Sequence, residues 1–238
     1  MKKTDSETIT LRIISGSLRS RKIQFACDRR TRPMKDRTRE AVLNLLGGTL
    51  EGTLAFDLFG GSGVLAFEAI SRGAHAAAIW EVLRHGAATI QSIANQLGIA
   101  DQTRVLHEDS FRWGQNLREN WGQLGPLFQA TNQIQATNQP EPTNQPEPTC
   151  LPEAAEPWPK ERPWVVFCCP PYAMWESQGE ALKSLVQQWW HAAPDDSLFA
   201  VELETETPIS WLPEGIEWDI RNYQPAKIAV AQKETTSS

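Results

Sequence analysis

The tetrapeptide Cys169-Pro170-Pro171-Tyr172 is the part of this chain whose residue types best suit chemistry. It ends an apolar run at residues 164–168, which predicts a buried parallel strand. Proline has no N–H, so the turn offers carbonyl oxygens without competing donors, and Tyr172 adds a flat aromatic face. At the carboxyl end of a strand, such a turn could hold a planar base and accept hydrogen bonds from its exocyclic amine. We therefore predict these four residues as the catalytic group, with a plain strand-ending turn as the alternative.

A second pattern lies upstream and predicts a nucleotide-like ligand. A predicted strand at residues 53–59 runs into a glycine-rich loop at 60–63, and a helix is expected to begin at Val64. Glycines let the backbone approach a ligand closely, and the first N–H groups of the helix point at it. A further strand at 76–80 ends in Glu81, whose carboxylate can accept from both hydroxyls of a ribose. The pattern therefore predicts a cofactor that contains adenosine.

The choice between two adenosine cofactors depends on neighbouring residues. The loop also fits a dinucleotide-binding motif, so a nicotinamide-dependent oxidoreductase stays open. Asp57, just before the loop, favours S-adenosylmethionine, because its carboxylate could meet an amino-acid end or hold the loop. Asp109 follows a predicted strand at 103–108 and could accept from an adenine amine or cap a helix. The predicted cofactor-binding residues are Asp57, Phe59, Gly60, Gly61, Ser62, Gly63, Glu81, Asp109 and Ser110.

Composition favours a cytoplasmic enzyme. The chain has 238 residues, of which 40% are hydrophobic, and no apolar run approaches the roughly 20 residues that a membrane span needs. No apolar segment follows the first residues, so no secretory signal is expected. The cysteines are Cys27, Cys150, Cys168 and Cys169, without a C-x-x-C pair. We expect reduced thiols, no metal site and a monomer.

Charge is distributed unevenly along the chain. Residues 1–40 hold 12 Lys and Arg against 5 Asp and Glu, whereas residues 41–238 hold 11 against 24. A basic arm on an acidic body suggests a polyanionic partner, although a solvated charged face is the alternative. A β-hairpin turning near Ser15–Ser17 and a helix from Pro33 to Leu46 are predicted here. The candidate contact residues are Arg12, Arg19, Arg21, Lys22, Arg32, Lys35 and Arg37.

The remaining pattern alternates between helices and strands. Helices are predicted at 84–97, 111–121 and 177–191, and strands at 198–203, 217–223 and 226–231, the last two as an antiparallel pair. Residues 122–163 contain polar, proline-rich repeats that cannot bury a core, so a flexible insertion is expected there. We divide the chain into a basic extension at 1–48 and a catalytic domain at 49–238.

Several short motifs are distributed along the chain: L-R-I-I-S-G at 11–16 with R-S-R-K-I at 19–23, R-P-M-K-D-R-T-R-E at 32–40, D-L-F-G-G-S-G at 57–63, I-S-R-G-A at 70–74, and R-N-Y at 221–223 with Lys227. Together these motifs resemble the RsmD family of 16S ribosomal RNA guanine-N2 methyltransferases. The resemblance covers nearly the whole chain outside residues 122–163.

The resemblance implies a fold, a cofactor and a substrate. The fold would be the α/β, Rossmann-like class I methyltransferase fold: a seven-stranded, mostly parallel sheet with an N-terminal β-hairpin and helix extension. S-Adenosylmethionine would donate a methyl group to a guanine N2 amine of 16S ribosomal RNA, within a small ribosomal subunit particle. The basic extension would bind RNA, Tyr172 would stack on the flipped base, and the Pro170 carbonyl would accept from its amine.

Three positions depart from the family pattern. Met34 replaces a threonine, Leu83 replaces an aspartate, and Cys169 stands where Asp or Asn would accept from the target amine. A thiol is a poor hydrogen-bond acceptor. An alternative is therefore a relative that binds S-adenosylmethionine and RNA without transferring a methyl group and acts in ribosome assembly.

Overall fold

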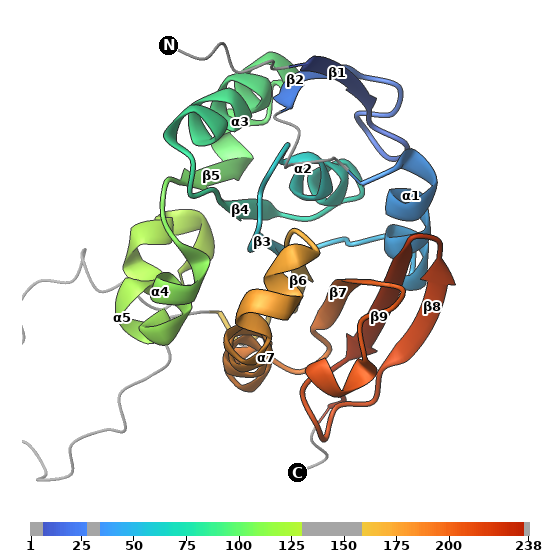
Figure 1. The fold of residues 1–238 in the computed structure, drawn as a ribbon. Coiled ribbons are helices and arrows are strands. Elements are labelled where there is room, and N and C mark those ends of the chain that lie inside the picture. The colour runs from blue at the N-terminus through green and yellow to red at the C-terminus, as the bar shows by residue number, and fades with distance from the viewer. Residues whose placement is uncertain (1–6, 28–33, 130–158, 236–238) are drawn as a thin grey trace, which may run out of the picture.

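The centre of the computed structural model, which describes residues 7–27, 34–129 and 159–235, is one seven-stranded sheet (Figure 1). Its strands are β3 (Leu54–Asp57), β4 (Ala76–Trp80), β5 (Thr103–Leu106), β6 (Trp164–Cys168), β7 (Leu198–Glu204), β8 (Asp219–Tyr223) and β9 (Ala226–Gln232). The spatial order is β5-β4-β3-β6-β7-β9-β8, and β9 runs antiparallel to both of its neighbours. The predicted α/β class and the mostly parallel sheet are confirmed.

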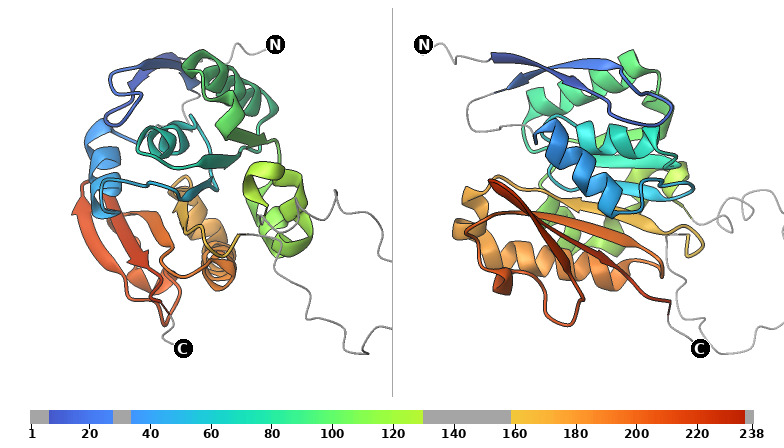
Figure 2. Two further views of the ribbon diagram at one scale, coloured as in Figure 1. Left: turned by 180° about the vertical axis from the view of Figure 1, so that it is seen from behind. Right: turned by 90° about the vertical axis from the view of Figure 1, so that its right-hand side faces the viewer.

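Helices cover both faces of the sheet (Figure 2). One face packs against α1 (Asp36–Leu45), α2 (Val64–Ser71) and α3 (Arg84–Leu97). The other packs against α4 (Ser110–Gln115), α5 (Leu117–Asn120) and α7 (Ala173–Ala192). Successive side chains along each strand point to opposite faces of the sheet. In β3, for example, Ala55 faces the first layer, whereas Phe56 faces the second, where its ring centroid lies 5.0 Å from that of Trp189.

Two predicted segments differ from the structure around the second layer. The helix expected at 111–121 is divided into α4 and α5, and the helix expected at 177–191 already begins at Ala173 and departs from helical geometry at Gln178. The first residues of the expected flexible insertion, 122–129, are instead packed against the body of the protein. Leu124 and Phe128 are buried in two short 3-10 turns, because these apolar residues fill the core beside α5. Residues 130–158 of that insertion lie outside the described residues.

The N-terminal hairpin contacts the C-terminal end of α2. It consists of β1 (Glu7–Arg12) and β2 (Lys22–Cys27), joined by residues 13–21, which is a longer connection than the predicted turn at Ser15–Ser17. In this connection, the Ser17 N–H donates to the Ser71 carbonyl at 2.8 Å, and the Leu18 N–H donates to Ser71 Oγ at 2.9 Å. Gly16 has φ +81°, and a Cβ there would collide with the Ser71 carbonyl. The close approach of this connection to α2 therefore requires glycine at position 16.

A buried ion pair joins the hairpin, α1 and α2. Glu68 Oε1 on α2 accepts from the Ile14 N–H at 2.7 Å and from Arg39 Nε on α1 at 3.2 Å. Arg39 Nη2 also donates to the Arg12 carbonyl at 2.7 Å. Both charged side chains of the pair are fully buried, and burial raises the pKa of Glu68 against the opposing effect of Ile14 and Arg39. Loss of one partner of such a pair typically costs about 3–5 kcal/mol.

Candidate functional site

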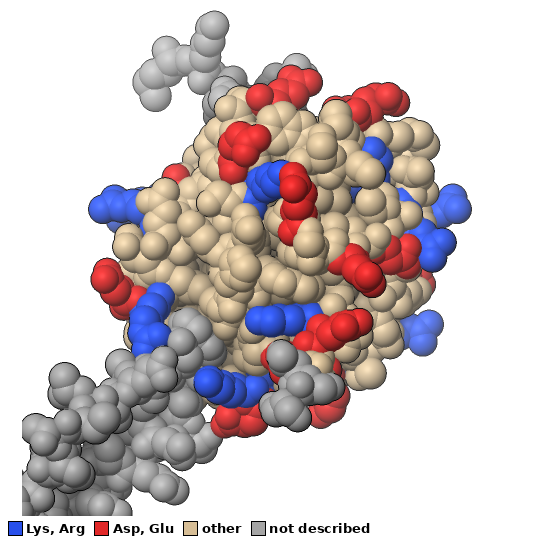
Figure 3. Space-filling model, turned by 90° about the horizontal axis from the view of Figure 1, so that it is seen from below, with Lys and Arg blue, Asp and Glu red and all other residues tan. Residues whose placement is uncertain are grey.

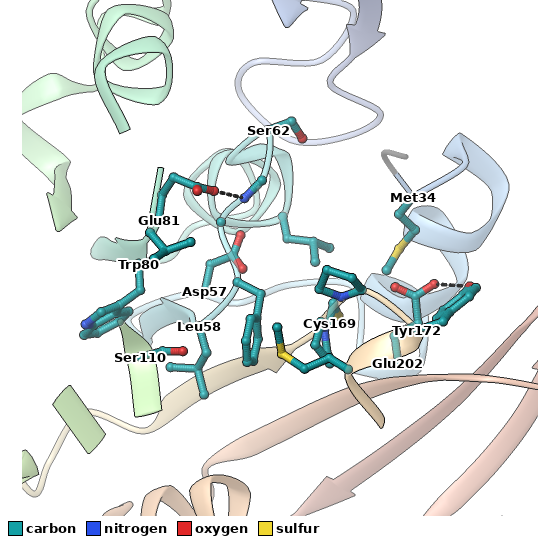
Figure 4. Close-up of a pocket in the computed structure, with 18 of the residues that line it drawn as sticks. Met34, Asp57, Leu58, Ser62, Trp80, Glu81, Ser110, Cys169, Tyr172 and Glu202 are labelled. Carbon is teal, nitrogen blue, oxygen red and sulfur yellow. Dashed lines mark hydrogen bonds between the residues drawn. The ribbon is translucent and has the colours of Figure 1, made fainter. Parts of the chain in front are cut away.

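The candidate site is a cavity of about 840 Å³ at the carboxyl ends of the central strands (Figure 4). Strand β3 pairs with β4 on one side and with β6 on the other, so chain order reverses here. Open α/β sheets bind ligands at this kind of position. The sequence-predicted residues that line the cavity are Asp57, Phe59, Gly60, Gly61, Ser62, Glu81, Asp109, Ser110, Cys169, Pro170, Pro171 and Tyr172. Of the predicted set, Gly63 is not in the lining and instead caps α2.

Glu81 holds the glycine-rich loop in place. Its Oε2 atom accepts from the Gly61 N–H at 3.0 Å, and its Oε1 atom accepts from the Leu83 N–H at 2.7 Å. The Gly60 N–H donates to the Trp80 carbonyl at 2.8 Å, which closes the loop against the end of β4. These bonds keep the Glu81 carboxylate at the cavity wall. It could accept from ribose hydroxyls there, as predicted.

Asp57 is buried at the base of the cavity, with 1% of its surface exposed. Burial raises the pKa of Asp57 to about 7; the charge of Glu81 adds to this rise, and a hydrogen bond from the Phe59 N–H opposes it. Its Oδ1 atom has no hydrogen-bond partner among the described residues. An unpartnered buried carboxylate oxygen is costly unless a ligand satisfies it. A cationic amino group would do so, which fits the amino-acid end of S-adenosylmethionine.

Asp109 follows β5, the strand next to β4, and is the residue before α4. Its Oδ1 atom accepts from the Phe111 N–H at 2.8 Å, so the capping role weighed for this residue is present. The side chain is exposed and lines the cavity together with the buried Ser110. Its remaining lone pairs can accept from an adenine amine, because a carboxylate has about four acceptor sites.

The Pro-Pro turn follows β6 and lines the cavity next to the glycine-rich loop that follows β3. Burial and the nearby charge of Glu202 raise the pKa of the Cys169 thiol well above its ordinary value, so it is neutral at pH 7. Tyr172 Oη donates to Glu202 Oε1 at 2.8 Å, and burial together with Glu202 raises the pKa of the phenol. Glu202 is 8% exposed and lines the cavity from β7. Our sequence analysis missed it, although a carboxylate within the apolar run of β7 was a signal.

The structure separates the predicted polyanion-binding residues. Lys35 lines the rim of the cavity. The exposed Arg19, Arg21 and Lys22 instead lie near the other end of α2, where Arg21 Nη2 donates to the Gln96 carbonyl at 3.1 Å. The eight residues of α2 span about 12 Å from the glycine-rich loop to the end that contacts the hairpin connection.

The other basic candidates lie between these two groups or outside the described residues. Arg12 is 3.9 Å from Asp36, and Arg37 is exposed on α1. Arg32 lies outside the described residues. On the face drawn in Figure 3, acidic and basic side chains are interspersed, so a polyanion would not find a surface of one sign there.

The part of the chain that the structure describes holds neither a metal-binding cluster nor a membrane-spanning helix. No cluster of three His, Cys, Asp or Glu side chains there could hold a metal ion. No described helix combines the length and apolar character that crossing a membrane requires.

We expect the burial of Asp57 to make stability depend on pH. The folded protein keeps a proton on Asp57 up to about pH 7, whereas an unfolded Asp loses it near its ordinary pKa of 3.8, so this residue lowers stability as pH rises between these values. Asp57→Asn should therefore gain stability relative to wild type by about 2–3 kcal/mol between pH 5 and pH 8. Urea unfolding of the ligand-free proteins measures the difference, with the exposed Asp101→Asn as control. An equal difference at both pH values would contradict the burial effect.

Comparisons with known proteins identify a family and several relatives of this chain. The family model described as "Conserved hypothetical protein 95" matches residues 11–139. Ribosomal RNA small subunit methyltransferase D of Escherichia coli K12 is 36% identical over 101 residues, which cover 42% of this chain and 50% of that protein. The protein of the same name from Buchnera aphidicola is 31% identical over 106 residues, covering 44% of this chain and 55% of that protein. The chain thus spans about half the length of the curated relatives it matches.

Among solved structures, yhhF from Escherichia coli superposes with a TM-score of 0.62 at 22% identity, covering 96% of this chain and 100% of that chain. This likeness confirms the predicted class I methyltransferase fold. Both curated relatives carry the name methyltransferase, so the comparisons give no support to the binding-only alternative. The resemblance to RsmD is confirmed, and S-adenosylmethionine is the cofactor that family and fold indicate. The chain belongs to the family described as Conserved hypothetical protein 95, and the curated relatives that it resembles are named methyltransferases.

Proposed function

We propose that this protein transfers a methyl group from S-adenosylmethionine to the N2 amine of a guanine in 16S ribosomal RNA. One observation carries the proposal. The glycine-rich loop after β3 and the Pro-Pro turn after β6 line the same cavity, because the two strands are adjacent and parallel. A methyltransferase needs its cofactor and its acceptor in one enclosed space, since most of the rate enhancement comes from alignment.

The cofactor would lie along the β3 and β4 side of the cavity. Asp57 would take the cationic amino group, Glu81 the ribose hydroxyls, and Asp109 the adenine amine, with the loop backbone against the adenosine. The bound cofactor supplies an electrophilic methyl group. In this arrangement the three carboxylates contact three different parts of one ligand, which a nicotinamide dinucleotide would not match at Asp57.

The target base would lie at the Pro-Pro turn. Tyr172 offers a stacking surface, and the Pro170 carbonyl can accept from the exocyclic amine. A base inside a folded RNA reaches such a pocket only after it is flipped out, and stacking on an aromatic side chain stabilises the flipped state. These residues would hold the amine nitrogen in line with the methyl group.

The names of the relatives support an RNA partner. Those proteins are named for the small ribosomal subunit, and this chain would act on 16S ribosomal RNA or on a small-subunit particle, as a monomer in the cytoplasm. Lys35 at the rim would bind the phosphates next to the flipped nucleotide. Arg19, Arg21 and Lys22 would bind a more distant stretch of the same RNA, since the hairpin lies beyond α2.

Methyl transfer to small ribosomal subunits that lack the modification tests the function. We expect the wild-type protein to move label from S-adenosylmethionine to 16S ribosomal RNA, with N2-methylguanosine as the product found by nucleoside mass spectrometry. Glu81→Ala should raise the KM for S-adenosylmethionine by about 5- to 150-fold, because a charged hydrogen bond is worth about 1–3 kcal/mol. Glu119→Ala, an exposed carboxylate on α5, serves as the control. No labelled RNA, a different methylated base, or tighter binding of NAD than of S-adenosylmethionine would overturn the proposal.

Salt dependence tests the proposed role of the hairpin in RNA binding. Replacing Arg19, Arg21 and Lys22 together by alanine should weaken RNA binding and reduce the slope of log K against log salt by up to about 2–3, because each phosphate contact contributes about 0.7–0.9. Affinity for S-adenosylmethionine should stay unchanged, since these residues lie away from the cavity.

A charge-matched control removes Arg104, Arg112 and Lys160, which are exposed and lie outside the extension. It should keep the wild-type slope. If the hairpin variant keeps it as well, the hairpin is a solvated surface and RNA binds elsewhere.

A further inference from the structure

Strand register places a carboxylate beside the position where this chain carries a thiol. Strands β6 and β7 are parallel, and Cys168 pairs with Val201. The next residues on the two strands, Cys169 and Glu202, are therefore lateral neighbours about 5 Å apart at the backbone and point to the same face of the sheet. The resemblance to the RsmD family implies an Asp or Asn acceptor at the position of Cys169, and Glu202 lies one strand away from that position.

The surroundings of Glu202 suit an acceptor role. Its side chain lines the same cavity as Cys169, Pro170 and Tyr172, although only 8% of the residue is exposed. Figure 4 shows its carboxylate beside Tyr172, which donates to Oε1 at 2.8 Å. No Lys or Arg of the described chain forms a salt bridge with it that would compete for the carboxylate. A carboxylate accepts only, and it has lone pairs left after one hydrogen bond.

We propose that Glu202 is a catalytic residue that accepts the hydrogen bond from the guanine amine in place of Cys169. The inference rests on the proposed function and adds a residue to it. Guanine has N–H donors at both N1 and N2 on one edge, and a single carboxylate can accept from both. Adenine has an acceptor at N1, so the same carboxylate would also disfavour adenine as a substrate.

The acceptor has a defined part in the transfer. The N2 lone pair forms the new nitrogen–carbon bond, while the carbon–sulfur bond of the sulfonium breaks and leaves its electron pair on sulfur. The nitrogen, now positively charged, releases one proton, which the Glu202 carboxylate accepts and then passes to water. Because burial raises the pKa of Glu202, its carboxylate is a better proton acceptor than an exposed one.

A simpler role for Glu202 would be to hold the Tyr172 ring, and two variants separate these roles. Glu202→Gln keeps the shape and can still accept from Tyr172, but it weakens acceptance from the amine and removes the proton acceptor. Tyr172→Phe keeps the stacking ring and removes only its bond to Glu202. We expect kcat for methyl transfer to fall by about 100-fold in Glu202→Gln and by no more than about tenfold in Tyr172→Phe. Glu204→Gln, an exposed carboxylate on the same strand, is the matched control.

Rescue provides a second measurement. Cys169→Asn supplies a neutral acceptor at the family position without placing a second charge next to Glu202. It should restore at least about tenfold of kcat in the Glu202→Gln background. Affinity for S-adenosylmethionine, measured by calorimetry, should be the same in all variants.

The possible results distinguish a failure of the acceptor role of Glu202 from a failure of the proposed function. If wild type is active and Glu202→Gln is equally active, or falls only as far as Tyr172→Phe, Glu202 is not the acceptor and the proposed function stands. If Cys169→Asn fails to rescue a folded, cofactor-binding Glu202→Gln protein, the acceptor role is also overturned. A wild type that transfers no methyl group to RNA overturns both.

Discussion

The parallel pairing of β3 with β6 is the constraint on which the candidate site depends. Asp57 at the end of β3 is in register with Phe167 near the end of β6, so the loop and the turn that follow them leave the sheet side by side. Strand β4 pairs with the other edge of β3 and brings Glu81 to the loop, where it accepts from Gly61. Strand β7 pairs with β6 and brings Glu202 to the turn. Residues at the carboxyl ends of β3, β4, β6 and β7 therefore line the same cavity.

The buried Glu68–Arg39 pair extends this arrangement to the N-terminal part of the chain. It connects α2, which begins at the glycine-rich loop, to α1 and to the backbone of the hairpin. The start of α1 and the residue before it, Lys35, thereby lie at the cavity rim. A buried ion pair is weak support for stability, but removal of one partner leaves an uncompensated charge, so the three elements are strongly held in one arrangement.

Local patterns predicted the elements that form the floor of the site. Apolar runs such as 164–168 and the loop at 60–63 have signals within a few residues, and β6 and α2 begin and end close to the expected positions. Features that depend on contacts between segments far apart in the sequence were not predictable from local patterns. Glu202 becomes relevant only because β7 lies next to β6, and Phe128 is buried only because its polar-looking segment packs on the aromatic layer. The distance between Arg19 and the cavity likewise depends on where the hairpin binds α2.

A crystal structure of the protein with S-adenosylhomocysteine would test most directly whether this cavity is the cofactor site. We expect the ligand's amino group at Asp57 Oδ1, its ribose hydroxyls at Glu81 and its adenine beside Asp109. The sulfur should point toward the Pro-Pro turn, with open space left between it, Tyr172 and Glu202 for a planar base. Ligand bound away from the ends of β3 and β6, or with its sulfur directed away from Pro170, would contradict the account.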